Sequence, residues 1–285
     1  MQNREKQITC QVCMHHCSLE PGQRGRCRAR KNDNGVIVCE NYGRITALAL
    51  DPVEKKPLRR FYPGSMILSA GSYGCNLNCS FCQNYQISMV GEDVCREESD
   101  QWVLISPGEM AARAWALRDR GNIGLAYTYN EPLIGWEYVR DTARLIRERG
   151  MKNVLVTNGC AAPDVLDALL PLTDAVNIDL KGFRESGYRK LGGSLETVKD
   201  CIIRALKTSH VELTTLVVPG ENDSTEEMEE EALWIASLDR EIPLHITRFF
   251  PRYRMTDREA TDVGQLHKLV ETAGKYLHHV YPGNC

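Results

Sequence analysis

The sequence MILSAGSYGCNLNCSFC occupies residues 66–82 and joins an apolar run to a polar loop with three cysteines. Met66–Ala70 has the length and apolar character of a buried strand. Gly74 then permits a tight turn into the loop, which carries Cys75, Cys79 and Cys82 within eight residues. The stretch therefore predicts a strand whose carboxyl end presents three thiols to one common space.

Beyond this stretch, short apolar runs alternate with amphipathic segments of helical length. The predicted strands are 66–70, 123–127, 153–157, 174–179, 211–217 and 243–247, and the predicted helices are 107–120, 133–149, 162–170, 195–208, 224–237 and 261–277. Such alternation indicates βαβ units around a parallel sheet. The sequence thus predicts an α/β fold, a partial (β/α)6 TIM-like barrel over residues 66–285. A doubly wound open sheet is the alternative that periodicity leaves open.

Several local signals support the helix boundaries. Ser106 precedes a proline at the first helical position, which is a favoured start. Ser224 and Glu227 have the spacing of a capping box. Gly121 and Gly150 follow two predicted helices, where a C-terminal stop is expected.

Residues 1–65 have a different texture, rich in cysteine, glycine and arginine, with short strands expected only at 36–39 and 45–50. Because the core of such a region is too small to be stable alone, we predict that residues 1–65 are a metal-binding N-terminal region and linker. Cys10, Cys13, Cys17 and Cys27 have the close spacing of a closed site for structural zinc or an auxiliary iron–sulfur cluster. His15 and His16 lie between two of these cysteines and are alternative ligands.

The overall composition excludes several classes of protein. The 285 residues include 35 Lys and Arg against 38 Asp and Glu, a net charge of −3 that argues against a nucleic-acid partner. Residues 1–10 lack the apolar stretch of a signal peptide, and no run has the length of a membrane span. We expect a cytoplasmic protein without a membrane partner, in which the 12 cysteines stay reduced and serve metal chemistry.

The three-cysteine loop is the strongest chemical signal. Iron–sulfur cubes usually take four cysteines, so three leave one iron without a protein ligand. An open metal position is where a small molecule can bind and be activated. A structural zinc site that borrows a fourth ligand, or three unrelated buried thiols, are the alternatives.

The spacing Cys75-x3-Cys79-x2-Cys82 resembles the signature of the radical S-adenosylmethionine superfamily. The resemblance implies a [4Fe-4S] cluster on these cysteines and S-adenosylmethionine on the unique iron. It implies reductive cleavage to a 5′-deoxyadenosyl radical that abstracts hydrogen from a substrate. Phe81 matches the aromatic residue of the motif and is expected to shield the cluster or pack against adenine.

Further segments resemble one subgroup, the radical enzyme of the AmmeMemoRadiSam system, within the pyruvate formate-lyase-activating-enzyme-like proteins. They include DPVEKKPLRRFYPGS, YTYNEP, VTNG, DLK, TTLVVPGEND and PLHITRFFPRY, in this order. The N-terminal CxxCxxxC…GxxGxC pattern belongs to the same subgroup, so the resemblance covers nearly the whole chain.

The resemblance also implies a set of cofactor-binding residues at the strand ends. Asn130 and Glu131 would meet the methionine amino group, and Lys181 the carboxylate. The remaining residues expected to contact the cofactor are Thr157, Asn158, Asp179 and His245, the last placed with Arg248 at the end of the sixth strand. Val156 stands where activating enzymes carry an aspartate for a monovalent cation, so a cation site is not expected.

The function implied is a radical oxidoreductase, with glycyl-radical-enzyme activation as one version. Modification of a small molecule or a protein side chain is the second version, and a non-catalytic iron–sulfur electron carrier is the alternative from another class. The basic linker with Lys55, Lys56, Arg59 and Arg60 suits an acidic electron donor such as flavodoxin or ferredoxin.

Overall fold

An eight-stranded sheet organises the protein, whose computed structural model describes residues 6–96 and 99–285. The strand order is β14-β13-β12-β11-β10-β9-β7-β6. Its strands are β6 (Ala47–Pro52), β7 (Met66–Gly71), β9 (Asn122–Tyr127), β10 (Lys152–Thr157), β11 (Ala175–Asp179), β12 (His210–Val217), β13 (Leu244–Arg248) and β14 (Val280–Gly283). All neighbours are parallel except β6, which pairs antiparallel with β7 at the edge. Each of the six predicted strands is present, with ends within one residue of those expected.

The helices follow the strands in the predicted alternation. They are α1 (Tyr85–Ser88), α2 (Pro107–Ala116), α3 (Trp136–Glu148), α4 (Pro163–Leu169), α5 (Glu185–Leu191), α6 (Leu195–Ala205), α7 (Thr225–Leu238) and α8 (Val263–Gly274). The described residues also form the 3-10 helices η2 (Val53–Lys55), η3 (Arg118–Arg120), η4 (Pro132–Gly135) and η5 (Leu170–Leu172).

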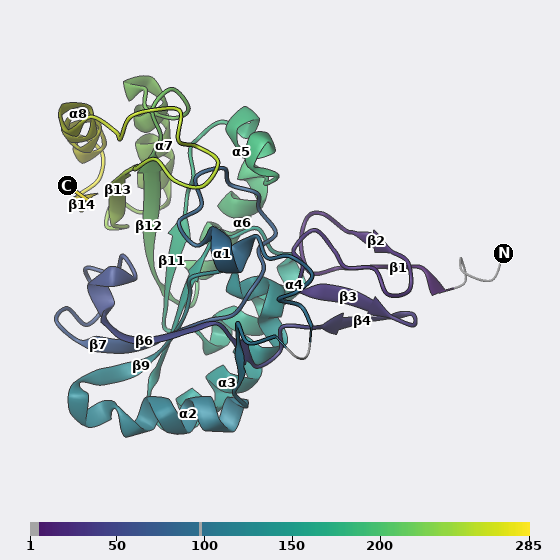
Figure 1. The fold of residues 1–285 in the computed structure, drawn as a ribbon. Coiled ribbons are helices and arrows are strands. Elements are labelled where there is room, and N and C mark those ends of the chain that lie inside the picture. The colour runs from purple at the N-terminus through teal and green to yellow at the C-terminus, as the bar shows by residue number, and fades with distance from the viewer. Residues whose placement is uncertain (1–5, 97–98) are drawn as a thin grey trace.

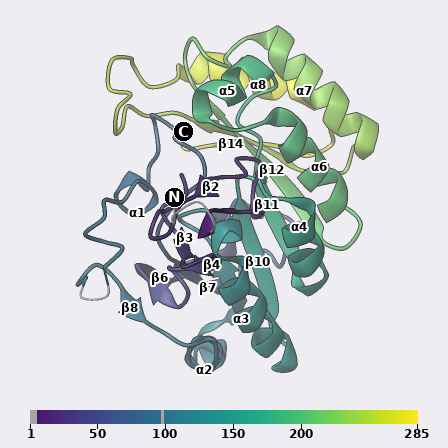
Figure 2. The same cartoon turned by 90° about the vertical axis from the view of Figure 1, so that its right-hand side faces the viewer.

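The strand order decides between the two predicted architectures. From β7 to β14 the order follows the sequence without a reversal, whereas a doubly wound sheet reverses direction at a switch point. Because crossovers between parallel strands are right-handed, a constant direction leaves the helices on one face of the sheet. Figure 2 shows them arranged around its outer side. The predicted α/β partial barrel is therefore confirmed, and it is open between β6 and β14.

Local signals set most helix ends, with a few differences from expectation. Ser106 and Glu109 form a complete capping box at the start of α2. The helix predicted over 107–120 is divided at Leu117 into α2 and η3, and Gly121, at φ +83°, ends η3. Ser224 caps α7, but the Glu227 carboxylate accepts a hydrogen bond from the Phe183 amide instead of the Ser224 amide. The short helices α1 and α5 were not predicted from the sequence.

The core lies between the sheet and its helices, and a second apolar cluster closes the amino end of the barrel. This cluster combines the β6–β7 connection (Val53, Leu58 and Phe61) with side chains from β7, β9, β10 and β11. The connection therefore acts as a plug, which leaves the carboxyl ends of the strands as the end where a site can form.

A small lobe of short strands lies beside the barrel (Figure 1). It contains the antiparallel pairs β1 (Ile8–Thr9) with β2 (Ser18–Leu19) and β3 (Arg30–Asp33) with β4 (Val36–Cys39), and β5 (Arg44–Ile45) pairs with β8 (Val103–Leu104). The strand expected at 36–39 is β4, whereas the one expected at 45–50 is β6, which belongs to the main sheet. Arg30 joins lobe to barrel, because its buried guanidinium donates to the Ile134 carbonyl and pairs with Glu137. Within the described part of the chain, no helix is long and apolar enough to cross a membrane.

Candidate active site at the carboxyl ends of the strands

The loop of residues 74–82, here called the cysteine loop, leaves the carboxyl end of β7. Gly74 has φ +88°, and a Cβ there would lie 2.3 Å from the Cys27 carbonyl oxygen, so only glycine fits. Cys79 is buried, and Cys75 and Cys82 are half-buried. The Leu77 amide lies 3.4 Å and the Asn158 amide nitrogen 3.6 Å from Cys75 Sγ, and both donate to it. The turn and these donors fix the first thiol of the motif.

The electrostatics of the loop suit a metal cluster better than free thiolates. Burial raises the pKa of Cys75 well above its usual range, and the charges of Glu131 and Cys79 raise it further. Burial likewise raises the pKa of Cys79 to about 11, although Lys181 opposes this change. Thiols in such a place ionise when a metal centre supplies positive charge, and metal binding then releases their protons. In residues 6–96 and 99–285, no group of three or more His, Cys, Asp or Glu side chains is arranged to hold a metal ion. The donor chemistry of the loop, three thiols within eight residues, fits an iron–sulfur cluster.

Asn130 holds the start of the cysteine loop. Its side-chain oxygen accepts a hydrogen bond from the Ser72 amide at 2.9 Å. Its side-chain nitrogen donates to the carbonyls of Tyr73 and Gly74 at 3.2 and 3.1 Å. The sequence analysis expected Asn130 to meet a ligand directly, but in the structure its side chain is used by the loop itself.

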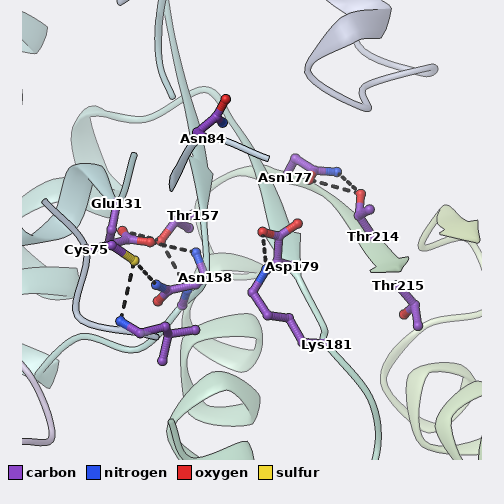
Figure 3. Close-up of polar contacts among 12 residues, drawn as sticks. Cys75, Asn84, Glu131, Thr157, Asn158, Asn177, Asp179, Lys181, Thr214 and Thr215 are labelled. Atoms are coloured by element: carbon purple, nitrogen blue, oxygen red, sulfur yellow. Dashed lines mark hydrogen bonds and ion pairs between the residues drawn. The ribbon is translucent and has the colours of Figure 1, made fainter. Parts of the chain in front are cut away.

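Glu131 joins the ends of β9 and β10. The carboxylate accepts hydrogen bonds from the Thr157 hydroxyl at 2.7 Å and the backbone amide of Asn158 at 2.8 Å (Figure 3). It also accepts one from the Leu133 amide at 2.9 Å. Burial raises the pKa of Glu131 to about 7, although these hydrogen bonds lower it in part. Both carboxylate oxygens are engaged, and Glu131 and Thr157 thereby orient Asn158. The side-chain amide of Asn158 in turn contacts Cys75 Sγ.

Asp179 and Lys181 form an ion pair at the end of β11. The Lys181 Nζ and Asp179 Oδ2 atoms are 2.8 Å apart (Figure 3). Burial opposes the charge of Lys181, but Asp179 and the Cys79 thiolate more than compensate and raise the pKa of the ammonium. Lys181 therefore places a permanent positive charge beside the cysteine loop.

A large cavity borders the cysteine loop on this side, with about 950 Å³ of empty space that includes open solvent. Its lining includes Ser80 and Phe81 of the cysteine loop and Lys181. Other lining residues come from 182–191, which include α5, from the β12–α7 loop and the start of α7, and from residues 254–255. Phe81 meets Phe249 edge to face with ring centroids 6.4 Å apart. The structure thus brings Phe81 and Lys181 to one cavity.

His245 does not lie at this end. It is the second residue of β13 rather than its last, and its imidazole donates to Glu212 at 2.6 Å. Glu212 also accepts from His210 and from the amides of Arg59 and Arg60. Both ends of β13 lie one residue later than expected. His245 therefore lies near the start of the strand, in the closed amino half of the barrel. We do not keep it among the proposed cofactor-binding residues.

The four N-terminal cysteines line a separate cavity. Cys10, Cys13 and Cys27 are buried and Cys17 is half-buried, and all four face the same space, together with His15 and His16. Burial raises the pKa of Cys13 to about 11, and the Cys27 thiolate adds to this shift. The pattern of spacing thus corresponds to a real spatial group.

The sequence analysis missed Asn76. This residue lies between the first two cysteines of the loop, where a polar side chain with a donor and an acceptor is the only sequence signal. Its side chain donates to the Cys160 carbonyl at 2.6 Å and accepts from Asn158 at 2.9 Å. Its carbonyl accepts from His15 at 2.8 Å. Asn76 therefore connects the cysteine loop both to β10 and to the N-terminal lobe.

A cysteine loop beside a charged cavity at the carboxyl ends of a partial barrel defines a class of enzyme. Residues 70–232 match the Radical SAM superfamily, and the chain belongs to this family. It is 37% identical over 289 residues to an uncharacterized protein of Methanocaldococcus jannaschii, MJ0808, covering 98% of this chain and 82% of that protein. It is 24% identical over 163 residues to the pyruvate formate-lyase-activating enzyme of Clostridium pasteurianum, covering 54% of this chain and 62% of that enzyme.

Among solved structures, the chain is similar to Streptococcus suis SuiB bound to S-adenosylmethionine. The TM-score is 0.56 at 14% identity, over 75% of this chain and 48% of that one, a likeness of fold. The cofactors of the family are a [4Fe-4S] cluster and S-adenosylmethionine. When bound, the cluster supplies the electron that splits S-adenosylmethionine into methionine and a 5′-deoxyadenosyl radical, which takes a hydrogen atom from a substrate.

Proposed function

We propose that Cys75, Cys79 and Cys82 bind the cluster, and that the cavity beside Phe81 and Lys181 receives S-adenosylmethionine and the substrate whose hydrogen is abstracted. The observation that carries this proposal is the shared wall. Ser80 and Phe81, which lie between the second and third cysteines, line the cavity directly. A molecule in the cavity is therefore next to the loop that holds the thiols, as a radical generated there requires.

Lys181 is the residue proposed to bind the methionine carboxylate. Its ammonium lines the cavity, its charge lowers the pKa of Cys79 in the cysteine loop, and Asp179 Oδ2 holds it at 2.8 Å. Charge-assisted hydrogen bonds to a carboxylate are stronger than neutral ones, and they are stronger still where water is excluded. Phe81, Leu191, Val218 and Met255 supply apolar lining that limits water around a reactive radical.

The residues expected to touch the methionine amino group are assigned a different role. Asn130, Glu131 and Thr157 act as positioning residues, because their polar atoms hold residues 72–74 and Asn158. Asn158 in turn contacts Cys75 Sγ. Backbone groups of this strand end remain in place to meet the ammonium.

We propose activation of a partner enzyme as the first version of the reaction. The cavity has exposed walls that carry Arg184, Lys190 and Glu221, so a chain segment of another protein has room to enter. The relative from Clostridium pasteurianum is itself an activating enzyme by name. Modification of a small molecule or side chain within the AmmeMemoRadiSam system is the second version.

The general reaction is tested by product formation. Anaerobically reconstituted protein with dithionite and S-adenosylmethionine should release 5′-deoxyadenosine, and Cys75→Ala should abolish this. Cys285→Ala removes an exposed thiol far along the chain and serves as the matched control. A reducible cluster with no 5′-deoxyadenosine would instead indicate an electron carrier, and an unchanged yield in Cys75→Ala would refute the ligand assignment.

The activase version needs its own experiment. Incubation with a candidate glycyl-radical enzyme, with flavodoxin or ferredoxin as the electron donor, should give the electron paramagnetic resonance doublet of a glycyl radical on the partner. Product formation from S-adenosylmethionine without any such doublet would favour the second version. The linker is not proposed as the docking site of the donor, because the amides of Arg59 and Arg60 donate to Glu212 at the amino end of the barrel and Lys56 is buried against Asp51.

A further inference from the structure

The N-terminal cavity lies outside the residues that match the Radical SAM superfamily. Two tight turns supply its thiols. In the first, the Cys10 amide donates to the Cys17 carbonyl at 2.9 Å, and the pairing of β1 with β2 closes the loop. In the second, the Gly25 amide donates to the Arg30 carbonyl at 2.8 Å and turns Cys27 back toward the first loop. Two chain segments, with nine residues between Cys17 and Cys27, thus deliver four thiols to one space.

The lobe around this cavity has few other means of holding its shape. Its strands β1 and β2 have two residues each. Apart from cysteine, the buried apolar side chains of residues 6–44 are Val12, Leu19 and Ala29. All four cysteines are free thiols in the structure. A core of this size is normally supplemented by a disulfide or a metal. Because the four thiols are not paired in disulfides, a metal is the remaining means of stabilisation.

The donor set defines which metals suit the cavity. Four thiolates without a required oxygen or nitrogen ligand are the set for structural zinc and for iron–sulfur clusters. His15 is already engaged, since its Nε2 donates to the Asn76 carbonyl at 2.8 Å, and His16 pairs with Gln11 at 3.0 Å. The four cysteines are therefore the ligands that we assign to the cavity. Their side chains must close in when the metal binds, since among the described residues no group of three or more such ligands is arranged around one ion.

The cavity is directly connected to the cysteine loop. The Cys27 carbonyl rests against Gly74, and His15 donates to the carbonyl of Asn76, so contacts from the lobe reach both residues adjacent to Cys75. The Val12 carbonyl accepts from the Ala162 amide at 2.9 Å, which fixes the lobe to the β10–α4 loop. A change in the shape of the four-cysteine turn would therefore move the residues on either side of a proposed cluster ligand.

We propose that Cys10, Cys13, Cys17 and Cys27 form a closed tetrathiolate site for zinc or an iron–sulfur cluster, and that the filled site positions the cysteine loop through His15 and Cys27. The metal-binding half is independent of the proposed radical reaction. The positioning half rests on the proposed ligands Cys75, Cys79 and Cys82. The two halves are tested separately.

The first experiment measures metal and sulfide in anaerobically purified full-length protein. A Cys75→Ala, Cys79→Ala, Cys82→Ala variant should retain about one zinc, or iron with equimolar sulfide, per chain. A Cys13→Ser, Cys27→Ser variant should lose that metal and keep about four irons. Cys39→Ser, a half-buried thiol of the same lobe outside the cavity, is the matched control and should change neither.

The arms of this experiment separate the two metals. Acid-labile sulfide with iron in the triple variant indicates a second cluster, and zinc without sulfide indicates a structural ion. If the Cys13→Ser, Cys27→Ser variant does not fold, cobalt titration of the triple variant replaces it, because four thiolates give cobalt intense charge-transfer bands. The proposal is overturned if the triple variant binds neither zinc nor iron with sulfide nor cobalt, or if the four thiols form disulfides in the native protein.

The second experiment tests positioning. His15→Ala should slow 5′-deoxyadenosine formation roughly 10-fold and alter the electron paramagnetic resonance spectrum of the reduced, S-adenosylmethionine-bound protein, with metal content unchanged. His15→Gln restores a donor to the Asn76 carbonyl and should restore both. Spectrum and rate that are identical in wild type and His15→Ala would overturn the positioning role and leave the metal site standing.

Discussion

The two ends of the barrel treat buried charge in opposite ways. At the amino end, Glu212 accepts hydrogen bonds from His210, His245 and the amides of Arg59 and Arg60, so its carboxylate is fully satisfied within the protein. Burial alone would raise the pKa of Glu212, but these donors lower it to about 2. At the carboxyl end, burial and like charge raise the pKa of Cys75, and among the described residues no cation lowers it. The buried carboxylate at the amino end is satisfied within the protein, whereas the Cys75 thiol is not stabilised as a thiolate.

This difference explains why residues of the same chemical type have different roles. The amino end is closed by the plug of Val53, Leu58 and Phe61, so its polar groups must satisfy one another. The carboxyl end is open to the cavity lined by Phe81 and Lys181. In barrels of this kind, residues at the amino end serve stability and residues at the carboxyl end serve chemistry. Substitutions at the two ends should therefore affect different measurements.

The largest effect is expected for Cys79→Ala. Removal of a buried thiol of the cysteine loop should abolish cluster binding and lower 5′-deoxyadenosine formation by at least about 1000-fold, because no reductive step remains. Iron content and product are measured under anaerobic conditions. The stability of the barrel should change little. A variant that unfolds, or one that binds as much iron as the wild type, would contradict the assignment.

Glu212→Gln should have the next largest effect, on stability. The pKa of Glu212 in the folded protein, about 2, lies below the ordinary value of 4.5, so the folded state binds fewer protons than the unfolded state between these values. The stabilisation is therefore complete above pH 4.5 and is lost as the pH falls toward 2, and it amounts to about 3 kcal/mol. Urea unfolding of the cluster-free protein should show this difference at pH 7 and a smaller one at pH 3.5. A difference that does not depend on pH would show that packing, not charge, is responsible.

Lys181→Met is expected to raise the KM for S-adenosylmethionine roughly 10- to 100-fold, since a charge-assisted hydrogen bond to its carboxylate is lost. The matched control is Lys190→Met. Lys190 lines the same cavity but is exposed and pairs with Glu221, so its loss should alter the KM less than about threefold. Equal effects of the two substitutions would mean that the cavity as a whole, and not Lys181, attracts the cofactor.

The smallest effect is expected for Phe81→Leu. Leucine keeps an apolar wall but loses the edge-to-face contact with Phe249, which is worth about 0.5–1.5 kcal/mol. The rate of 5′-deoxyadenosine formation should fall by less than about 10-fold, while oxygen-induced loss of iron should become faster if Phe81 shields the cluster. Iron release in air, compared with wild type, measures this.

The sequence predicted the parts of the site that are local. The cysteine loop, its glycine turn and the six strands are all encoded by neighbouring residues, because strand periodicity and turn chemistry act over a few positions. Lys181 was placed correctly at a strand end, and the four N-terminal cysteines were grouped by their spacing alone. Each of these predictions depended on residues close together in the chain.

Only the tertiary structure decided how distant residues share their hydrogen bonds. Glu131 and Asn130 lie at the expected strand end, yet their polar atoms are taken by Thr157, Asn158 and residues 72–74. His245 is held by Glu212 on the neighbouring strand. The register between strands and the number of donors around each buried carboxylate depend on long-range packing, which composition and spacing do not encode. The chain by itself therefore determined which groups reach the carboxyl end of the barrel, and the fold determined which of them remain available for a ligand.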